Sequence, residues 1–255
     1  MSGRPTALFP LFAGLEALEG VGPKTAALLE QLHVLKPRDL IFTLPYSGID
    51  RAVRPSVLGL DFPTVATVEV EVIQHHPARA RGRPTRVQVE DRDTTFELVF
   101  FHARGEYLQK ILPVGGRRVV SGKLEMFDSV IQMTHPDHIL PLDEAGDLPL
   151  FEPVYPLTAG VSQKVMYKAT RAALARMPEF DEWADAEQLR QAGWSTWAAS
   201  AQAAHAPTCL ADLTATAPAR ERLAYDEFFA HQLTLALARM NRRKGKGRVS
   251  TGDGA

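Results

Sequence analysis

The sequence predicts an α+β protein in which a group of short strands is flanked by helices on both sides. Residues 66–140 contain runs in which apolar and polar side chains alternate, the pattern of strands with one buried face. The segments before and after these runs carry apolar residues at three- and four-residue intervals, as amphipathic helices do. Glycines and prolines fall between the runs and mark their ends.

Five runs are expected to form strands, namely residues 66–72, 86–90, 95–101, 119–126 and 130–133. Asp91-Arg92-Asp93 lies between the second and third runs and is a polar turn suited to a hairpin. Residues 104–112 have helical spacing, and Pro113 with Gly115-Gly116 ends that helix. Three strands, a helix and two strands is the order of the OB-fold, a five-stranded β-barrel. Other small barrels and meanders show the same alternation.

The alternation also predicts which aromatic side chains face solvent. The barrel interior is filled in this register by Phe96, Leu98 and Phe100. Phe101 breaks the alternation and therefore points outward, and Tyr107 follows on the next helix. An exposed aromatic ring can stack on a nucleic-acid base, and it can equally be covered by a neighbouring domain.

The connection between the first two predicted strands is strongly basic. Residues 75–86 contain no acid but two histidines and the arginines Arg79, Arg81, Arg83 and Arg86. OB-folds bind nucleic acid through a strand face and the loops joining strands one to two and four to five. Clustered cations are what phosphates require, so this loop is a candidate binding surface, with a solvated charged loop as the alternative.

Composition limits the classes of function. The chain has 255 residues, 45% hydrophobic content and a net charge of −1, so attraction to polyanions has to come from local clusters. Its single cysteine, Cys209, excludes an internal disulfide framework and a cysteine-rich zinc site. Neither a signal peptide nor a bilayer-length apolar run is found, and we expect a cytoplasmic protein without membrane insertion.

Residues 18–26, Leu-Glu-Gly-Val-Gly-Pro-Lys-Thr-Ala, are similar to a helix-hairpin-helix motif. Such a motif meets phosphate with amide groups at a helix start, which makes Gly20, Gly22 and Lys24 candidate DNA contacts. The alternative is a helical hairpin that only packs, between apolar residues 8–18 and a helix at 24–32. A nucleotide-binding P-loop is excluded because its residue spacing is absent.

His135-Pro136-Asp137-His138 is interpreted as a turn at a strand end. No second spaced His/Asp pair lies nearby, so no metal site is expected.

The chain is expected to divide into four parts. These are a helical region at 1–60, the barrel at 61–140, a connector with helices at 141–215, and a C-terminal helix with a basic tail at 216–255. The pattern over 220–243 predicts the longest helix, with an apolar stripe formed by Leu223, Phe228, Leu233, Leu235 and Leu237. Nothing after this helix can build another domain, so the chain is expected to be a fragment.

Several motifs in one order resemble the N-terminal DNA-binding region of the RecG family of bacterial branch-migrating helicases. They are residues 18–24, 38–45, 100–101, 115–122, 132–136 and 223–233. The resemblance implies an OB-fold "wedge" domain that splits a replication fork, with Phe101 and Tyr107 as the wedge aromatics. It also implies two further helicase domains that use ATP and Mg²⁺. Since this sequence has no P-loop, we expect no ATP hydrolysis and no cofactor in this chain.

The function predicted is recognition of branched DNA, such as forks and Holliday junctions, without sequence preference, in repair and recombination. Phosphate contacts are expected from the basic residues Arg79, Arg81, Arg83, Arg86, Arg117, Arg118, Lys123 and Lys24. The alternative is a protein-interaction module that docks a partner such as single-strand binding protein, with the C-terminal helix on the helicase domains. We expect a monomer, since no coiled-coil seam is found.

Overall fold

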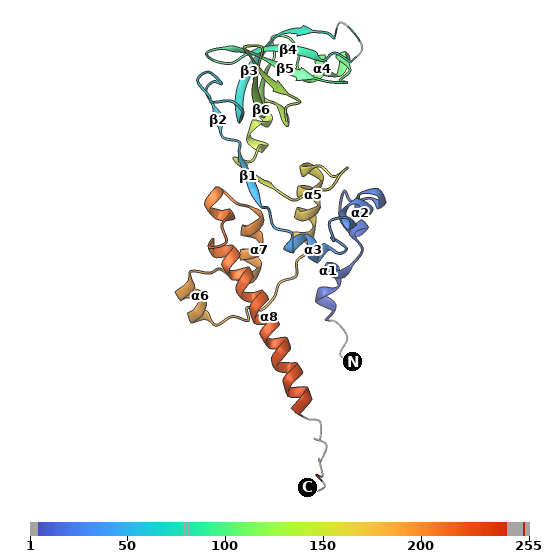
Figure 1. Cartoon of the computed structure of the whole chain (residues 1–255), viewed down its shortest axis with the longest axis vertical. Coiled ribbons are helices and arrows are strands. Elements are labelled where there is room, and N and C mark those ends of the chain that lie inside the picture. Colours follow the sequence, from blue (N-terminus) through green and yellow to red (C-terminus); the bar gives the residue numbers. More distant parts are fainter. Residues whose placement is uncertain (1–4, 79, 81, 244–251, 253–255) are drawn as a thin grey trace. The chain divides into compact units, whose positions relative to one another are not determined.

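The computed structural model describes residues 5–78, 80, 82–243 and 252, and Figure 1 shows the course of the chain. It divides into two compact units. One is Ser47–Val154, and the other combines Met1–Tyr46 with Tyr155–Ala255. Strands gather in the first unit and helices in the second, each around its own hydrophobic core, so the α+β class predicted from the sequence is confirmed. The four-part division stays a prediction.

The Ser47–Val154 unit holds the strands and one α-helix, α4 (Gly105–Ile111). The strands are β1 (Ser47–Asp50), β2 (Val53–Arg54), β3 (Thr64–His76), β4 (Thr85–Glu90), β5 (Thr95–Phe100), β6 (Arg117–Phe127), β7 (Val130–Thr134), β8 (His138–Pro141) and β9 (Phe151–Val154). A 3₁₀ turn, Leu142–Asp147, lies between β8 and β9. β1 and β9 form an antiparallel pair of their own.

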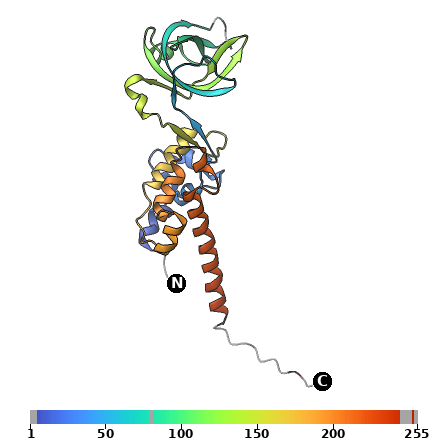
Figure 2. The ribbon, with the colours of Figure 1, turned by 90° about the vertical axis from the view of Figure 1, so that its left-hand side faces the viewer.

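The other described strands form one mixed sheet in the order β2-β3-β4-β5-β7-β6-β8. The β2–β3 and β5–β7 pairs are parallel and the rest antiparallel. β3 also pairs with β6, so the pairings of β3, β4, β5, β7 and β6 make a closed circuit. Figure 2 shows these strands curving around a common interior.

Besides its short pairing with β2, the long strand β3 has two longer partners, one along each part of its length. Residues 64–71 pair with β6, and residues 71–76 pair with β4. The register with β4 shifts between Val72 and Gln74, where one residue is left over. Such a bulge increases the local bend and twist, which lets one strand continue from one partner to the other.

Burial follows the predicted alternation over most of the sheet. Ala66, Val68, Val70 and Val72 are buried, and they pack with the other core residues Val87, Val89, Phe96, Leu98, Phe100, Val120, Leu124 and Met133. Met126 departs from the pattern, because the alternation along residues 119–126 gives it the same side as the buried Val120 and Leu124, yet it is 51% exposed. Beyond Leu124, β6 pairs only with β7, so the end of this hairpin extends past the residues that would cover it.

Arg51 is the charged centre of this unit and is almost fully buried. Its guanidinium donates to Ser121 at 2.9 Å, to Asp137 at 2.9 Å and to Glu152 at 2.8 Å. These residues lie on β6, before β8 and on β9, so one side chain ties together segments that are distant in the sequence. A buried charge requires such partners.

The second unit is helical. Its elements are the 3₁₀ turns Thr6–Leu8, Leu15–Ala17 and Leu210–Leu213 and the helices α1 (Phe9–Phe12), α2 (Pro23–Glu30), α3 (Pro37–Phe42), α5 (Gln163–Leu174), α6 (Ala186–Ala192), α7 (Trp197–His205) and α8 (Pro218–Arg243). The predicted helical run over residues 8–18 is broken into short turns. The break lies at Ala13 and Gly14, whose backbone is extended, and glycine costs entropy in a helix. Pro10 lies in the first turn of α1, where its missing N–H is tolerated.

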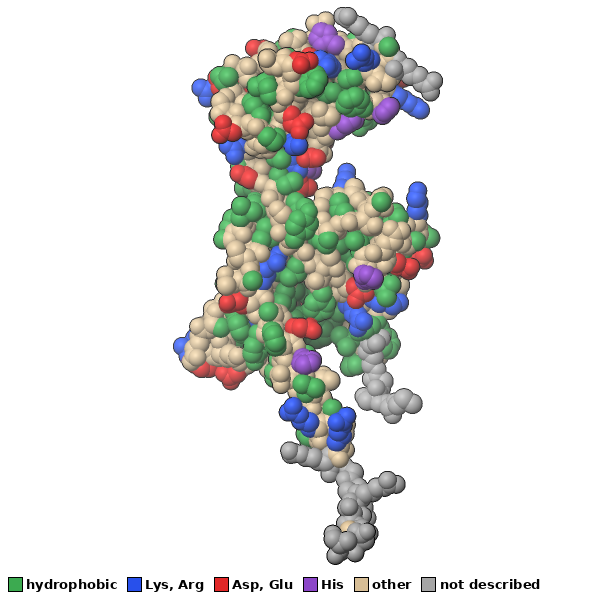
Figure 3. Space-filling model, in the orientation of Figure 1, with side chains coloured by type: hydrophobic (Ala, Val, Ile, Leu, Met, Phe, Trp, Pro, Cys, Tyr) green, Lys and Arg blue, Asp and Glu red, His purple; other side chains and the backbone are tan. Residues whose placement is uncertain are grey.

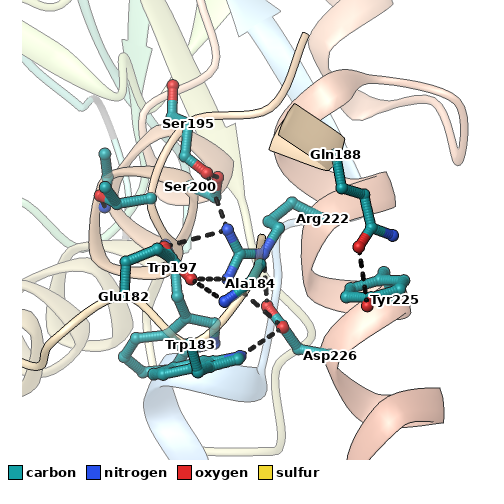
Figure 4. Close-up of polar contacts among 12 residues, drawn as sticks. Glu182, Trp183, Ala184, Gln188, Ser195, Trp197, Ser200, Arg222, Tyr225 and Asp226 are labelled. Carbon is teal, nitrogen blue, oxygen red and sulfur yellow. Dashed lines mark hydrogen bonds and ion pairs between the residues drawn. The ribbon is translucent and has the colours of Figure 1, made fainter. Parts of the chain in front are cut away.

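A buried arginine, Arg222, fixes the start of α8 (Figure 4). It donates to Asp226 at 2.8 Å, to Glu182 at 2.7 Å and to the carbonyl of Ser195 at 3.0 Å. The indole of Trp183 donates to Asp226 at 2.8 Å. This network joins α8 to residues 182–183, which precede α6, and to Ser195, which lies between α6 and α7. The buried guanidinium of Arg222 is paired with the carboxylates of Glu182 and Asp226, as a buried charge requires.

The predicted apolar stripe of α8 is buried only at its beginning. Leu223 is buried, whereas Phe228, Leu233, Leu235 and Leu237 are exposed. The second half of α8 extends past the other helices of its unit (Figure 1), so no described surface of that unit covers it. Figure 3 shows hydrophobic side chains along this part, interspersed with charged ones.

Candidate nucleic-acid interface

A groove of about 370 Å³ lies on the Ser47–Val154 unit, between the β3–β4 connector and the β6–β7 hairpin. Gly82, Arg83 and Pro84 of the connector and Arg86 of β4 line one side. Its other lining residues are Val99, Phe101, Glu125, Met126, Phe127, Gln132 and Thr134. The groove therefore brings two of the predicted basic residues next to the predicted outward-facing aromatic.

Phe101 lies just after β5, where the alternation changes. Phe100 is buried against the core, and Phe101 is 41% exposed. The main-chain N–H of Phe101 donates to Nε2 of His135 at 3.2 Å, and the two rings lie 5.9 Å apart. The main-chain N–H of His135 in turn donates to Val99 O at 2.9 Å. Phe101 is thus an exposed ring on a backbone that is fixed from the neighbouring strand.

Arg86 is held on the outer face of the sheet by its strand neighbours. It lies opposite Val99 in the β4–β5 register, and its guanidinium pairs with Glu97 at 3.1 Å. Gln132, opposite Glu97 on β7, donates to the same carboxylate at 3.0 Å. For Arg83, no described carboxylate lies within ion-pair distance, so its charge is available to a ligand.

The hairpin side of the groove was missed from the sequence. Phe127 is 57% exposed and lies opposite Val130 at the tip of the β6–β7 hairpin. Asp128 and Ser129 both have positive φ, 48° and 65°, as a two-residue hairpin turn requires. The signal was present in the sequence, since a short polar pair between two apolar runs predicts such a turn.

The remaining basic candidates on this unit have protein partners. Arg117 pairs with Glu69, beside Glu71, and Lys123 pairs with Glu125 at 2.5 Å. Arg118 donates to the carbonyl groups of residues 111 and 117, both at 2.8 Å, which connects the end of α4 to β6. None of these three side chains lines the groove.

The second wedge candidate, Tyr107, is exposed on α4. It is not among the described residues that line the groove beside Phe101. Arg79 and Arg81 lie outside the described residues.

Gly20, Gly22 and Lys24 belong to the helical unit. Gly20 has φ of 77°, a left-handed conformation that glycine adopts without strain. Gly22 is the N-cap of α2, which begins at Pro23, and Lys24 is exposed on its first turn. The element directly before Gly20 is the 3₁₀ turn Leu15–Ala17, so in the predicted first helix only Phe9–Phe12 has α-helical form.

The His135 to His138 turn has structural partners. His135 accepts from Phe101, Asp137 pairs with Arg51, and His138 lies 3.3 Å from Glu152. The hydrogen bond with His138, together with Arg51, lowers the pKa of Glu152. Within the described ranges, no group of three or more His, Cys, Asp and Glu side chains is placed to hold a metal ion. Nor does any described helix have the length and apolar character that a membrane span needs.

The fold and the groove define an α+β module whose mixed sheet presents aromatic and basic side chains together. The family model of the RecG wedge domain matches residues 15–177. The chain therefore belongs to the RecG wedge domain family.

Relatives agree with this assignment, and a solved structure agrees with the fold. The ATP-dependent DNA helicase RecG of Escherichia coli K12 is 29% identical over 238 residues, which cover 88% of this chain and 33% of that protein. The RecG of Pasteurella multocida is 26% identical and covers 89% and 33%. A solved structure of RecG bound to a three-way DNA junction matches 96% of this chain and 33% of its own, with a TM-score of 0.73 and 23% identity. This chain spans about a third of the length of the curated relatives it matches.

Proposed function

We propose that this chain binds branched DNA without sequence preference and that Phe101 stacks on a base at the junction. The observation that carries the proposal is an exposed aromatic ring, fixed by His135, beside Arg83 and Arg86 in one groove. Stacking on an aromatic is sequence-tolerant because every base has a π-face, and arginines attract phosphates of any sequence. The similar RecG whose structure was solved with a three-way DNA junction supports the choice of branched DNA.

We further propose that the Ser47–Val154 unit is a five-stranded OB-fold barrel. The closed circuit of β3, β4, β5, β7 and β6 supports this, with α4 between β5 and β6. In that interpretation the β3–β4 connector and the β6–β7 hairpin are the two loops through which OB-folds bind oligonucleotides. The groove lies between them.

The other predicted DNA contacts are proposed in a secondary role. Arg117, Arg118 and Lys123 lie outside the groove, and like Arg86, which pairs with Glu97, they would have to exchange a protein partner for a phosphate, which reduces the net gain. The remaining proposed contacts are Tyr107, Arg79, Arg81, Gly20, Gly22 and Lys24.

We assign the ATP-dependent activity of the RecG relatives to parts of those proteins beyond the third that this chain matches. Under this proposal the chain itself needs no ATP or Mg²⁺, acts as a monomer in the cytoplasm, and serves fork processing, repair and recombination. Helicase domains would be its partners in a full-length protein.

A second candidate function is protein docking, and the exposed apolar side chains of α8 favour it. Phe229, Leu233, Leu237 and Met240 recur at three- and four-residue intervals and are all exposed, so they form one apolar face of α8 of the kind that protein partners cover. Single-strand binding protein and helicase domains are the partners proposed for this role.

Fluorescence anisotropy separates the two candidates. The full chain is titrated against a labelled three-way junction, a model fork and a linear duplex of the same sequence, across a salt series. Branched-DNA recognition predicts tighter binding to both branched substrates at every salt concentration, with affinity falling as salt rises. Equal affinity for fork and duplex contradicts it, and no affinity for any DNA favours the docking role.

A further inference from the structure

The groove has a second exposed aromatic, Phe127, whose position the family resemblance does not explain. Phe127 and its neighbour Met126 form the wall opposite Arg83 and Arg86, and both are more than half exposed. About half of each side chain stays in contact with solvent, so folding gains only part of the free energy that full burial of these apolar groups would give. Their exposure is typical of a binding surface.

The floor of the groove is polar and suits the edge of a base. Gln132 and Thr134 reach it from β7, on either side of the core residue Met133. The side-chain amide nitrogen of Gln132 donates a hydrogen bond to Glu97, whereas the side-chain amide oxygen of Gln132 has no hydrogen-bond partner among the described residues. Bases carry donors and acceptors on their exposed edges, which an amide oxygen and a hydroxyl can meet.

The charged side chains of the groove are unevenly distributed between its two sides. The cations Arg83 and Arg86 line the connector side, and the carboxylate of Glu125 lines the hairpin side. Glu125 is held by Lys123 at 2.5 Å, yet its charge still disfavours a phosphate along that wall. A strand in the groove would therefore place its phosphates on the arginine side and its base toward Phe127.

The volume of the groove limits the size of the ligand that it can hold. A volume of about 370 Å³ is at the lower end of the range for ligand sites, which is roughly 300 to 1,000 Å³. It is too small for a base pair together with its two backbones. It suits one nucleotide.

We propose that the groove holds one unpaired nucleotide of a DNA branch, whose base stacks on Phe127 and whose phosphates contact Arg83 and Arg86. This inference rests on the proposed function and adds to it a site for single-stranded DNA next to the wedge aromatic. Phe101 and Phe127 then have separate roles. Phe101 stacks at the junction, and Phe127 stacks on the first base that has left the duplex.

The test uses the full chain and two forks that differ at one position. One fork has a single-stranded arm with a normal nucleotide next to the junction, and the other has an abasic site there. Binding is measured by anisotropy for wild type, Phe127→Ala, Phe127→Tyr and the control Val130→Ala, which removes the apolar side chain opposite Phe127. Circular dichroism and thermal melting establish that each variant is folded.

Loss of one stacked base weakens binding about 5- to 150-fold. We expect Phe127→Ala to lose that factor on the normal fork and nothing on the abasic fork, while Phe127→Tyr and Val130→Ala bind like wild type. Phe127→Ala binding the normal fork as tightly as wild type overturns the proposal. An equal loss on both forks also overturns it, because the contact is then not with the base.

The two proposals fail in different ways. If wild type binds fork and linear duplex alike, the proposed function is wrong. If wild type prefers the fork and Phe127→Ala keeps both the affinity and the sensitivity to the abasic site, branched-DNA recognition stands. The base site at Phe127 is then wrong, and the groove serves a protein partner or no ligand.

Discussion

The main-chain amide of Phe101 donates a hydrogen bond to Nε2 of His135, 3.2 Å away. The imidazole also lies against two rings, at 5.9 Å from Phe101 and at 6.1 Å, edge-on, from Phe100. His135 itself has a left-handed backbone, with φ of 48°, and its main-chain N–H donates a hydrogen bond to the carbonyl of Val99. The exposed ring of Phe101 is therefore oriented by one histidine from the adjoining strand.

This relationship predicts that His135→Ala weakens recognition of the junction without removing phosphate contacts. Loss of one neutral hydrogen bond corresponds to about a 2- to 10-fold fall in the preference for fork over duplex. Duplex affinity and its salt dependence stay unchanged. Anisotropy with both substrates measures the ratio.

His135→Gln is the matched variant, since its amide oxygen can accept from the Phe101 amide where the imidazole nitrogen does. It should recover most of the fork preference. If Ala and Gln at this position behave alike, the hydrogen bond does not position Phe101.

Arg222 predicts a stability effect confined to the helical unit. Arg222→Met leaves Glu182 and Asp226 without their cation, and breaking a buried pair costs about 3 to 5 kcal/mol. All three tryptophans lie in this unit, so their fluorescence during urea unfolding reports on it selectively. Arg239→Met, on the exposed part of α8, is the control and should unfold like wild type.

The same network predicts how stability depends on pH. Hydrogen bonds from Arg222 lower the pKa of Glu182 from 4.5 to about 2. A carboxyl whose pKa is lower in the folded state contributes stability that is complete above about pH 4.5 and is lost as the pH falls toward 2. The difference in unfolding free energy between wild type and Glu182→Gln should therefore be largest at pH 7 and shrink below pH 4.5. The exposed Glu187→Gln serves as control, and a difference that does not change with pH contradicts the account.

Gly20 predicts a backbone effect. With φ of 77°, Gly20→Ala forces an L-residue into the left-handed region, which costs about 1 to 2 kcal/mol. The three described heavy atoms nearest to the new Cβ all belong to the flexible Lys168 side chain, which can move, so the cost is assigned to the backbone. Gly14→Ala, with negative φ and open space, is the control. Equal urea midpoints for the two variants would mean that the left-handed conformation is not required.

Much of the sheet was predictable from the sequence, because the alternation of apolar and polar residues along a strand indicates which side chains are buried. The buried residues Val68, Val70 and Val72 alternate with the half-buried Glu69 and the exposed Glu71, and that period is a direct consequence of strand geometry. The outward position of Phe101 followed from the same rule. Met126 shows its limit, since alternation gives the face of a residue but not whether another element covers that face.

The charged centres were not predictable. Arg51 and Arg222 are buried, whereas arginine in a sequence is expected at the surface. Their partners lie up to about a hundred positions away, as Arg51 and Glu152 do, and no local pattern indicates such pairs. In the basic loop, the local cluster of arginines was enough to identify Arg83 and Arg86 as candidate contacts. It could not show that Phe127, more than forty positions later, lies across the groove from them.

The most direct measurement compares fork and duplex affinities of wild type, Phe101→Ala and Phe228→Ala by fluorescence anisotropy in a salt series. Phe228 is an equally apolar, exposed residue of the other unit and serves as the control. We predict that Phe101→Ala loses about 5- to 150-fold of the fork preference, with unchanged duplex affinity and salt slope, while Phe228→Ala matches wild type. A fork preference that survives in Phe101→Ala would contradict the central claim.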